Sequence, residues 1–396
     1  MKKSLLLGSA AALVIAPAAF AADLPVVEPV EYVKVCDAFG AGFHYIPGTE
    51  TCLKFSGRVR TEFGIGSTDP DHGLTAATHV NDRNDTTFFN SNFELVVNAS
   101  SMTEIGLLVG QFAISGSNEG TVSLGDAWIT IGENILVGRE TSRFDFGAGY
   151  GIYDAYYGDE GLNQFTFIMP FGNGFSATLG LEDARDRTIA IAQGNGAGVA
   201  VGQNTVSQAG MEIPDVVASL RISQGWGSAQ VSGALHQLRI VDNTNSESDT
   251  DWGFAVEAGI ELNVGSMTKI KVKAGYADGA LHYIGGGSVG ADMIVSVVGA
   301  NTSILDTYSG YDVLAAVTHT IGDLSLSLTG QYVDLDDQAE ITYVGATASY
   351  EVVENLTVAL TGQYTDFDYN PLYTSANALA LDHDDWAAKL RIQRSF

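Results

Sequence analysis

Long apolar runs are missing from nearly all of this chain of 396 residues. After residue 16 no stretch approaches the roughly 18 uninterrupted apolar residues of a spanning helix, so we expect no transmembrane helix. Basic residues are also few, since 19 lysines and arginines face 47 aspartates and glutamates and give a formal net charge of −28. Without a basic run, such a surface argues against nucleic acid as a partner. Hydrophobic residues still form 45% of the chain, an apolar content that disordered chains of similar charge lack.

Cysteine is limited to Cys36 and Cys52, which lie near the N-terminus. No CxxC motif and no Cys/His cluster accompanies them, which argues against a redox or metal site. In an exported protein we expect them to form a disulfide that braces the segment before the first strand and contributes about 3 kcal/mol. The histidines show no HExxH spacing, and no clustered nucleophile and base is found. The sequence therefore predicts neither an enzyme nor a cofactor.

The N-terminus has the pattern of a secretory signal peptide. Two lysines follow Met1, an apolar stretch runs from Leu5 to Ala16, and Ala19-Phe20-Ala21 fits a small-x-small cleavage site. We therefore expect residues 1–21 to be a cleaved signal peptide, residues 22–52 to be an N-terminal segment that holds the disulfide, and residues 53–396 to be the folded domain.

Apolar and polar residues alternate through that domain. In residues 53–66, Phe55, Val59 and Phe63 fall on one face, and small or polar residues fall on the other. Period two with one apolar and one wet face is the signal of a β-strand. The same Leu-Thr-Gly-Gln-Tyr pattern recurs at 328–332 and 360–364, which predicts two strands that run the same way through the same environment.

Short turns and long polar loops alternate between these strands. Seven turns rich in Gly, Asn, Asp and Ser are expected, the first of them near Ser100-Ser101. They separate eight longer gaps, at roughly 67–85, 116–121, 142–161, 184–213, 241–251, 279–310, 335–338 and 368–384. The sequence thus predicts an all-β fold, a 16-stranded antiparallel transmembrane β-barrel with both chain ends on the short-turn side. A barrel of this size leaves an aqueous channel inside.

Aromatic residues support the membrane assignment. Six of them share the apolar face of their strands and fall at the same end of the sheet: Trp252, Tyr276, Tyr311, Tyr332, Tyr364 and Trp386. We expect these rings to form an aromatic girdle at the boundary between outer-membrane lipid and water.

Basic residues mark one part of the predicted pore wall. The first and last strands must pair to close the barrel, and both place cations on the inward face: Lys54, Arg58, Arg60, Lys389 and Arg391. We expect them to form one basic patch, which sets a transverse field for polar solutes if acids lie opposite. Because the mouth loops carry most of the acid excess, we also expect a weak preference for cations.

Several segments resemble alphaproteobacterial outer-membrane general diffusion porins, namely residues 31–52, 171–183, 214–221, 226–234 and 390–396. The resemblance implies a homotrimer in the outer membrane through which small hydrophilic solutes and ions pass. It also implies that the third loop, 142–161, folds inward and narrows the pore. We expect the acidic side of that constriction to be formed by Asp145, Asp154, Asp159 and Glu160. Terminal Phe396 is similar to the signal that barrel assembly machinery reads.

Two other functions fit the same strands. A solute-specific sugar channel would be blocked by one sugar at low concentration, and a surface receptor or adhesin would have a blocked lumen. The sequence names no preferred solute and no size limit.

Overall fold

The computed structural model describes residues 34–66, 86–118, 120, 122–152, 155, 158, 160–187, 190–194, 199–201, 206–242, 246, 248–286, 289–298, 301–370 and 383–396. The chain divides into two units, Met1–Lys34 and Val35–Phe396. Only Lys34 of the first unit is described, so the predicted signal peptide at 1–21 lies outside the described residues. All that follows concerns the second unit.

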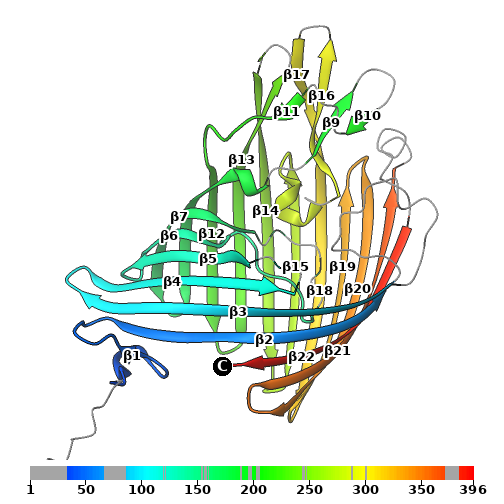
Figure 1. The fold of residues 1–396 in the computed structure, drawn as a ribbon. Coiled ribbons are helices and arrows are strands. Elements are labelled where there is room, and N and C mark those ends of the chain that lie inside the picture. The colour runs from blue at the N-terminus through cyan, green and yellow to red at the C-terminus, as the bar shows by residue number, and fades with distance from the viewer. Residues whose placement is uncertain are drawn as a thin grey trace, which may run out of the picture. The chain divides into compact units, whose positions relative to one another are not determined.

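Sixteen strands among the described residues form one closed antiparallel barrel. They are β2 (Cys52–Gly66), β3 (Thr86–Thr103), β4 (Gly106–Ser117), β5 (Val122–Ile131), β6 (Ile135–Thr141), β7 (Gly161–Gly172), β8 (Phe175–Glu182), β12 (Asp215–Gln224), β13 (Gly227–Asp242), β14 (Ser248–Val264), β15 (Thr268–Asp278), β18 (Ser309–Ile321), β19 (Leu324–Leu335), β20 (Ala339–Val353), β21 (Leu356–Tyr369) and β22 (His383–Ser395). Closure comes from β22 pairing with β2, where Figure 1 shows the last and first barrel strands side by side. The predicted all-β barrel is confirmed.

The short turns lie largely where the sequence placed them. Gly322 and Asn355 adopt positive φ of 59° and 64° in two of them, a conformation that tight hairpins require and that Gly and Asn tolerate. One expected turn was misplaced. The turn near Ser100 lies a few residues later, between the end of β3 at Thr103 and the start of β4 at Gly106. No local pattern marked this end, because Ser100 and Ser101 suit a strand face as well as a turn.

The N-terminal segment is held by the expected disulfide. Cys36 and Cys52 are bonded, with Cα atoms 6.2 Å apart. Between them lie the short 3₁₀ helix η1 (Asp37–Phe39) and β1 (His44–Tyr45), which pairs with the start of β2. The bond thus fixes a small hairpin against the first barrel strand.

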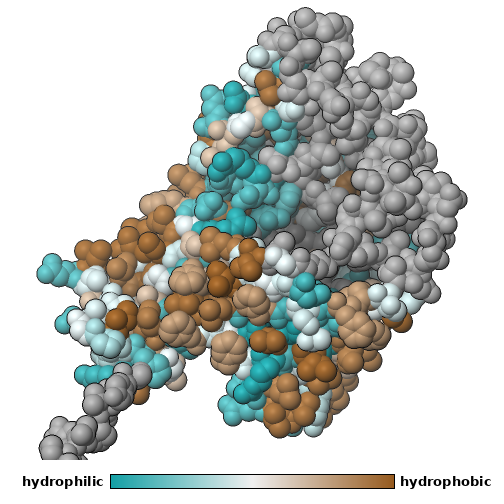
Figure 2. All heavy atoms as spheres, in the orientation of Figure 1, coloured by the Kyte–Doolittle hydropathy of each residue, from teal (hydrophilic) through white to brown (hydrophobic). Residues whose placement is uncertain are grey.

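The barrel is apolar outside and polar inside. Along β13, Gln230, Ser232 and His236 face inward and are buried, while Val231 and Leu235 are 61% and 52% exposed on the other face. Figure 2 shows apolar side chains gathered over β3 to β5, with hydrophilic ones toward the strand ends. Within the described ranges, no helix is long and apolar enough to cross a membrane. The outward apolar face is the one that lipid covers in a membrane barrel.

The fourth and sixth long connections form structure that the sequence did not predict. The fourth contains η2 (Ala184–Arg187), β9 (Ala190–Gly194), β10 (Val199–Val201) and β11 (Val206–Gln208), and the sixth contains η3 (Leu281–Ile284), β16 (Ala291–Val298) and β17 (Asn301–Thr307). Strands β10, β9, β16 and β17 make a separate four-stranded sheet in which β9 and β16 are parallel. Figure 1 shows this sheet beyond one end of the barrel strands.

Candidate functional site

The described residues of the third long connection, between β6 and β7, lie against the inner wall of the barrel. The amide of Phe146 donates to Glu257 Oε1 at 2.6 Å, and Lys271 Nζ donates to the carbonyl oxygen of Ala148 at 2.9 Å. The Tyr150 amide and carbonyl both bond to Thr329 Oγ1 at 3.0 Å. Glu257, Lys271 and Thr329 share the inward faces of β14, β15 and β19. The predicted inward-folded third loop is therefore confirmed.

Aromatic residues of this loop pack it onto the inner wall of the barrel. Phe144 is fully buried, and Phe146 lies where a Cβ on Gly259 would approach it to 2.3 Å. The hydroxyl of Tyr150 donates to Glu261 at 2.7 Å. Burial and this bond to a carboxylate raise the pKa of Tyr150, so its hydroxyl stays protonated.

A buried charge cluster fixes the middle of the loop. Lys273 Nζ lies 3.1 Å from Asp145 and 3.0 Å from Glu257, and all three side chains are at most 1% exposed. Two carboxylates around one ammonium satisfy a charge that would otherwise be costly to bury. Asp145 therefore ties the loop to β15, and it is not open to water in the passage.

Of the other three predicted acids, the structure describes only Glu160. Glu160 is 37% exposed and lies 3.7 Å from His282 Nε2, and partial burial raises the pKa of its carboxyl group. Asp154 and Asp159 lie outside the described residues. For Asp154, Asp159 and Glu160, a place on the acidic side of the constriction stays a prediction.

The basic residues of the opposite wall are brought together by the pairing of β2 with β22. Arg58 lies 2.7 Å from Glu94, and Arg391 lies 2.6 Å from Glu62. Lys389 also faces Glu62, at 3.7 Å, whereas Arg60 Nε donates to the neutral amide oxygen of Gln393 at 3.0 Å.

Lys54 lies apart from this group. Pairing with β22 begins only at Arg58, so Lys54 falls beyond the paired stretch, toward the disulfide segment. There its Nζ lies 5.8 Å from the centroid of the Phe43 ring.

Two carboxylates were missed as members of the wall. Glu62 and Glu94 sit among the cations and neutralise part of their charge. Strand parity alone places Glu62 inward beside Arg60, so the signal was present in the sequence.

A polar recess lies along this wall. It has a volume of about 310 Å³ and is lined by Arg58, Arg60, Asn92, Phe93, Glu94, Ser115, Gly116, Ser117 and Ser123 on β2 to β5. Guanidinium, carboxylate, amide and hydroxyl groups together offer donors and acceptors to hydrated solutes.

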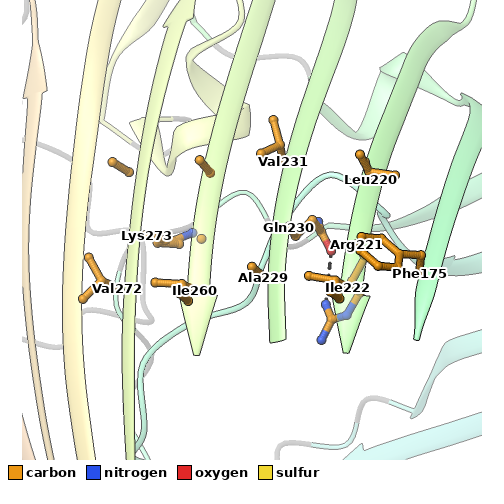
Figure 3. A pocket seen from close by; sticks show the side chains of 13 residues that line it. Phe175, Leu220, Arg221, Ile222, Ala229, Gln230, Val231, Ile260, Val272 and Lys273 are labelled. Carbon is orange, nitrogen blue, oxygen red and sulfur yellow. Dashed lines mark hydrogen bonds between the residues drawn. The ribbon is translucent and has the colours of Figure 1, made fainter. Parts of the chain in front are cut away.

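A second groove lies on the outward face of the barrel. It has a volume of about 400 Å³ and runs over β8 and β12 to β15. Figure 3 shows Leu220, Val231 and Val272 around it, together with the hydrogen bond between Arg221 and Gln230. Leu220 and Val231 are outward-facing and exposed, so this groove faces lipid and lies off the path of solutes.

The six predicted girdle residues lie on outward faces in neighbouring register positions. Tyr276 pairs with Tyr311, and Tyr364 pairs with Trp386. Trp252 is 49% exposed, and the rings of Tyr311 and Tyr332 are 6.1 Å apart. Their contact with the lipid boundary stays a prediction. Phe396 is 60% exposed and its backbone pairs with Gly57.

Known proteins resemble most of this chain. The family model described as the Porin subfamily matches residues 23–388. Porin Omp2b of Brucella suis is 33% identical over 326 residues, which cover 74% of this chain and 78% of that porin.

Two solved structures share the fold. The outer membrane channel DcaP of Acinetobacter baumannii has a TM-score of 0.68 at 15% identity and covers 89% of this chain and 99% of its own. The trimer form of OmpT of Vibrio cholerae has a TM-score of 0.54 at 13% identity, with 88% and 100% covered. The chain therefore belongs to the porin subfamily and is an outer-membrane channel protein through which small hydrophilic solutes diffuse passively.

Proposed function

We propose that this chain is a general diffusion porin whose narrowest part lies between the inward third loop and the wall of β22, β2 and β3. The observation that carries the proposal is the line of bonds from Phe146, Ala148 and Tyr150 to β14, β15 and β19. These bonds hold the loop on one side of the lumen, which leaves water on the other side.

The side of the lumen opposite the third loop is lined mainly by charged side chains. Arg58, Arg60 and Arg391 alternate there with Glu62 and Glu94. Arg60 bonds to a neutral amide, so we propose that it is the least compensated cation of this wall. A polar solute orients in the resulting field, whereas an apolar one loses more by displacing ordered water.

The proposed assembly is a homotrimer inserted by the barrel assembly machinery. OmpT, whose fold this chain shares, is known in a trimer form. An outward apolar surface suits both lipid and a second copy of a barrel. Exposed Phe396 at the end of β22 fits the proposed role as an assembly signal.

Liposome swelling with sugars of graded size tests the channel and its constriction. Removal of residues 150–161 should admit larger sugars, because the bonds from Tyr150 to Thr329 and Glu261 are lost with it. Removal of residues 371–382, a stretch of the same length between β21 and β22, is the matched control. An unchanged size limit in the first variant would contradict the proposed constriction, and inhibition by a single sugar would favour a sugar-specific channel.

Ion selectivity is tested by the reversal potential under a salt gradient. The net charge of −28 predicts a weak preference for cations, because acids outnumber bases in the loops at the mouth. A reversal potential of the sign expected for anions would defeat this part of the proposal.

A further inference from the structure

A second segment enters the barrel from the sixth long connection. Leu281, Tyr283 and Ile284 of η3 are at most 1% exposed. They form a buried cluster with inward-facing residues of the wall, among them Val333 and Ile341. Helix η3 thus fills part of the lumen beside the third loop.

Tyr283 touches both limbs of the third loop. Its ring centroid lies 4.7 Å from that of Phe144, on the limb that follows β6. On the limb that precedes β7, a Cβ added to Gly158 would lie only 2.1 Å from the carbonyl oxygen of Tyr283. Only glycine allows this approach, so the returning limb is fitted to the backbone of η3.

Arg187 of η2 joins the same contact from the fourth connection. It is 1% exposed, its guanidinium carbon lies 3.9 Å from the centroid of the Tyr283 ring, and Nη1 donates to the carbonyl oxygen of Gly158 at 3.0 Å. Glu182 at the end of β8 lies 3.6 Å from Nη2 and supplies the counter-charge. One buried cation thus binds the ring of η3 and the backbone of the third loop together.

The other end of Tyr283 is fixed to the barrel wall. Its hydroxyl donates to Asp215 Oδ2 at 2.8 Å, and His236 Nδ1 lies 2.9 Å from the same carboxyl group. Asp215 and His236 face inward on β12 and β13 and are buried. The third loop therefore rests on a side chain that the wall holds rigidly.

We propose that η3 is a second constriction element and that Arg187 and Tyr283 are positioning residues that hold the third loop at its working distance from the opposite wall. The proposal rests on the proposed function, that is, on conduction through the barrel. When the contact is lost, the returning limb at Gly158 moves away from η3 and the passage widens.

Single-channel recording of Arg187→Gln against Arg185→Gln tests this. Both variants lose one positive charge from η2, but the side chain of Arg185 is 67% exposed and forms an ion pair with the neighbouring Asp183. We expect Arg187→Gln to raise conductance about twofold, since conductance follows the open cross-section, and Arg185→Gln to match the wild type. Arg187→Lys, which keeps a cation and a donor, should return conductance toward the wild-type value.

A purely structural role of Arg187 would change only the thermal stability of the barrel, which its heat-dependent migration in gels measures. A positioning role would change the conductance as well. Lower stability with unchanged conductance in Arg187→Gln would overturn the proposal. If Arg187→Gln does not insert, Tyr283→Phe, which loses only the bond to Asp215, should raise conductance, and an unchanged value would overturn the proposal as well. A silent wild type would contradict the proposed function itself, whereas a conducting wild type with an unaltered Arg187→Gln would contradict only this inference.

Discussion

Lys273 shows how individual residues set the interior of the barrel. It is buried between Asp145 and Glu257, whereas Lys269, on the same face of β15, is 55% exposed and 3.9 Å from Glu261. Removal of a buried charge leaves its partners uncompensated, but removal of an exposed one changes little.

We therefore expect Lys273→Met to lower the free energy of unfolding by about 3–5 kcal/mol, and Lys269→Met to leave it nearly unchanged. Urea unfolding in detergent measures both. Equal midpoints for the two variants would show that the cluster does not hold the loop.

Strand residues of the site were predictable, and loop residues were not. Period two along β15 places Lys271 and Lys273 on the inward face. Pairing of β2 with β3 brings Arg58 beside Glu94, and closure of β22 onto β2 brings Arg391 beside Glu62. The partner of Lys273 is Asp145, which lies in a loop without periodicity, so no pattern in the sequence joins the two.

At the scale of elements, burial shifts the pKa values of two groups at η3 in opposite directions. Burial lowers the pKa of His282 to about 4 and raises that of Asp292, which accepts the Leu281 amide, to about 6. The stability linked to His282 is lost as pH falls from 6.5 toward 4, because the opened segment binds the extra proton. The stability linked to Asp292 is lost as pH rises from 3.8 toward 6, because the closed segment binds it.

When either Asp292 or His282 is replaced, the pH dependence of the opening of η3 should come from the other group alone. In Asp292→Asn, opening of η3 should become easier as pH falls, and in His282→Gln it should become easier as pH rises. Hydrogen exchange at the Leu281 amide, corrected for its intrinsic pH dependence, measures the opening. The same pH slope in both variants would contradict this account.

The elements also show where prediction from sequence ends. The connection between β19 and β20 was expected at 335–338, and the structure has β19 ending at Leu335 and β20 beginning at Ala339. The sheet that joins β9 to β16 was missed, because it pairs residues such as Ala190 and Ala291 that are distant in the chain. Local alternation predicts that a strand exists, but it does not identify a partner in another loop.

At the scale of the molecule, one arrangement accounts for both faces of the barrel. Outward residues such as Phe55, Val231 and Leu360 are more than half exposed and need lipid, whereas inward ones such as Gln230 and Thr361 are polar. A sandwich would bury the apolar face, but closure of β22 onto β2 turns it outward. The consequence is a column of water through the centre, which we propose is narrowed by the third loop and η3.

The most direct test of that column is electrical. Purified mature protein added to a planar lipid bilayer should produce discrete current steps whose size rises in proportion to the conductivity of the salt solution. A bilayer that stays silent after insertion, or steps that do not change with salt, would contradict an aqueous passage through this barrel.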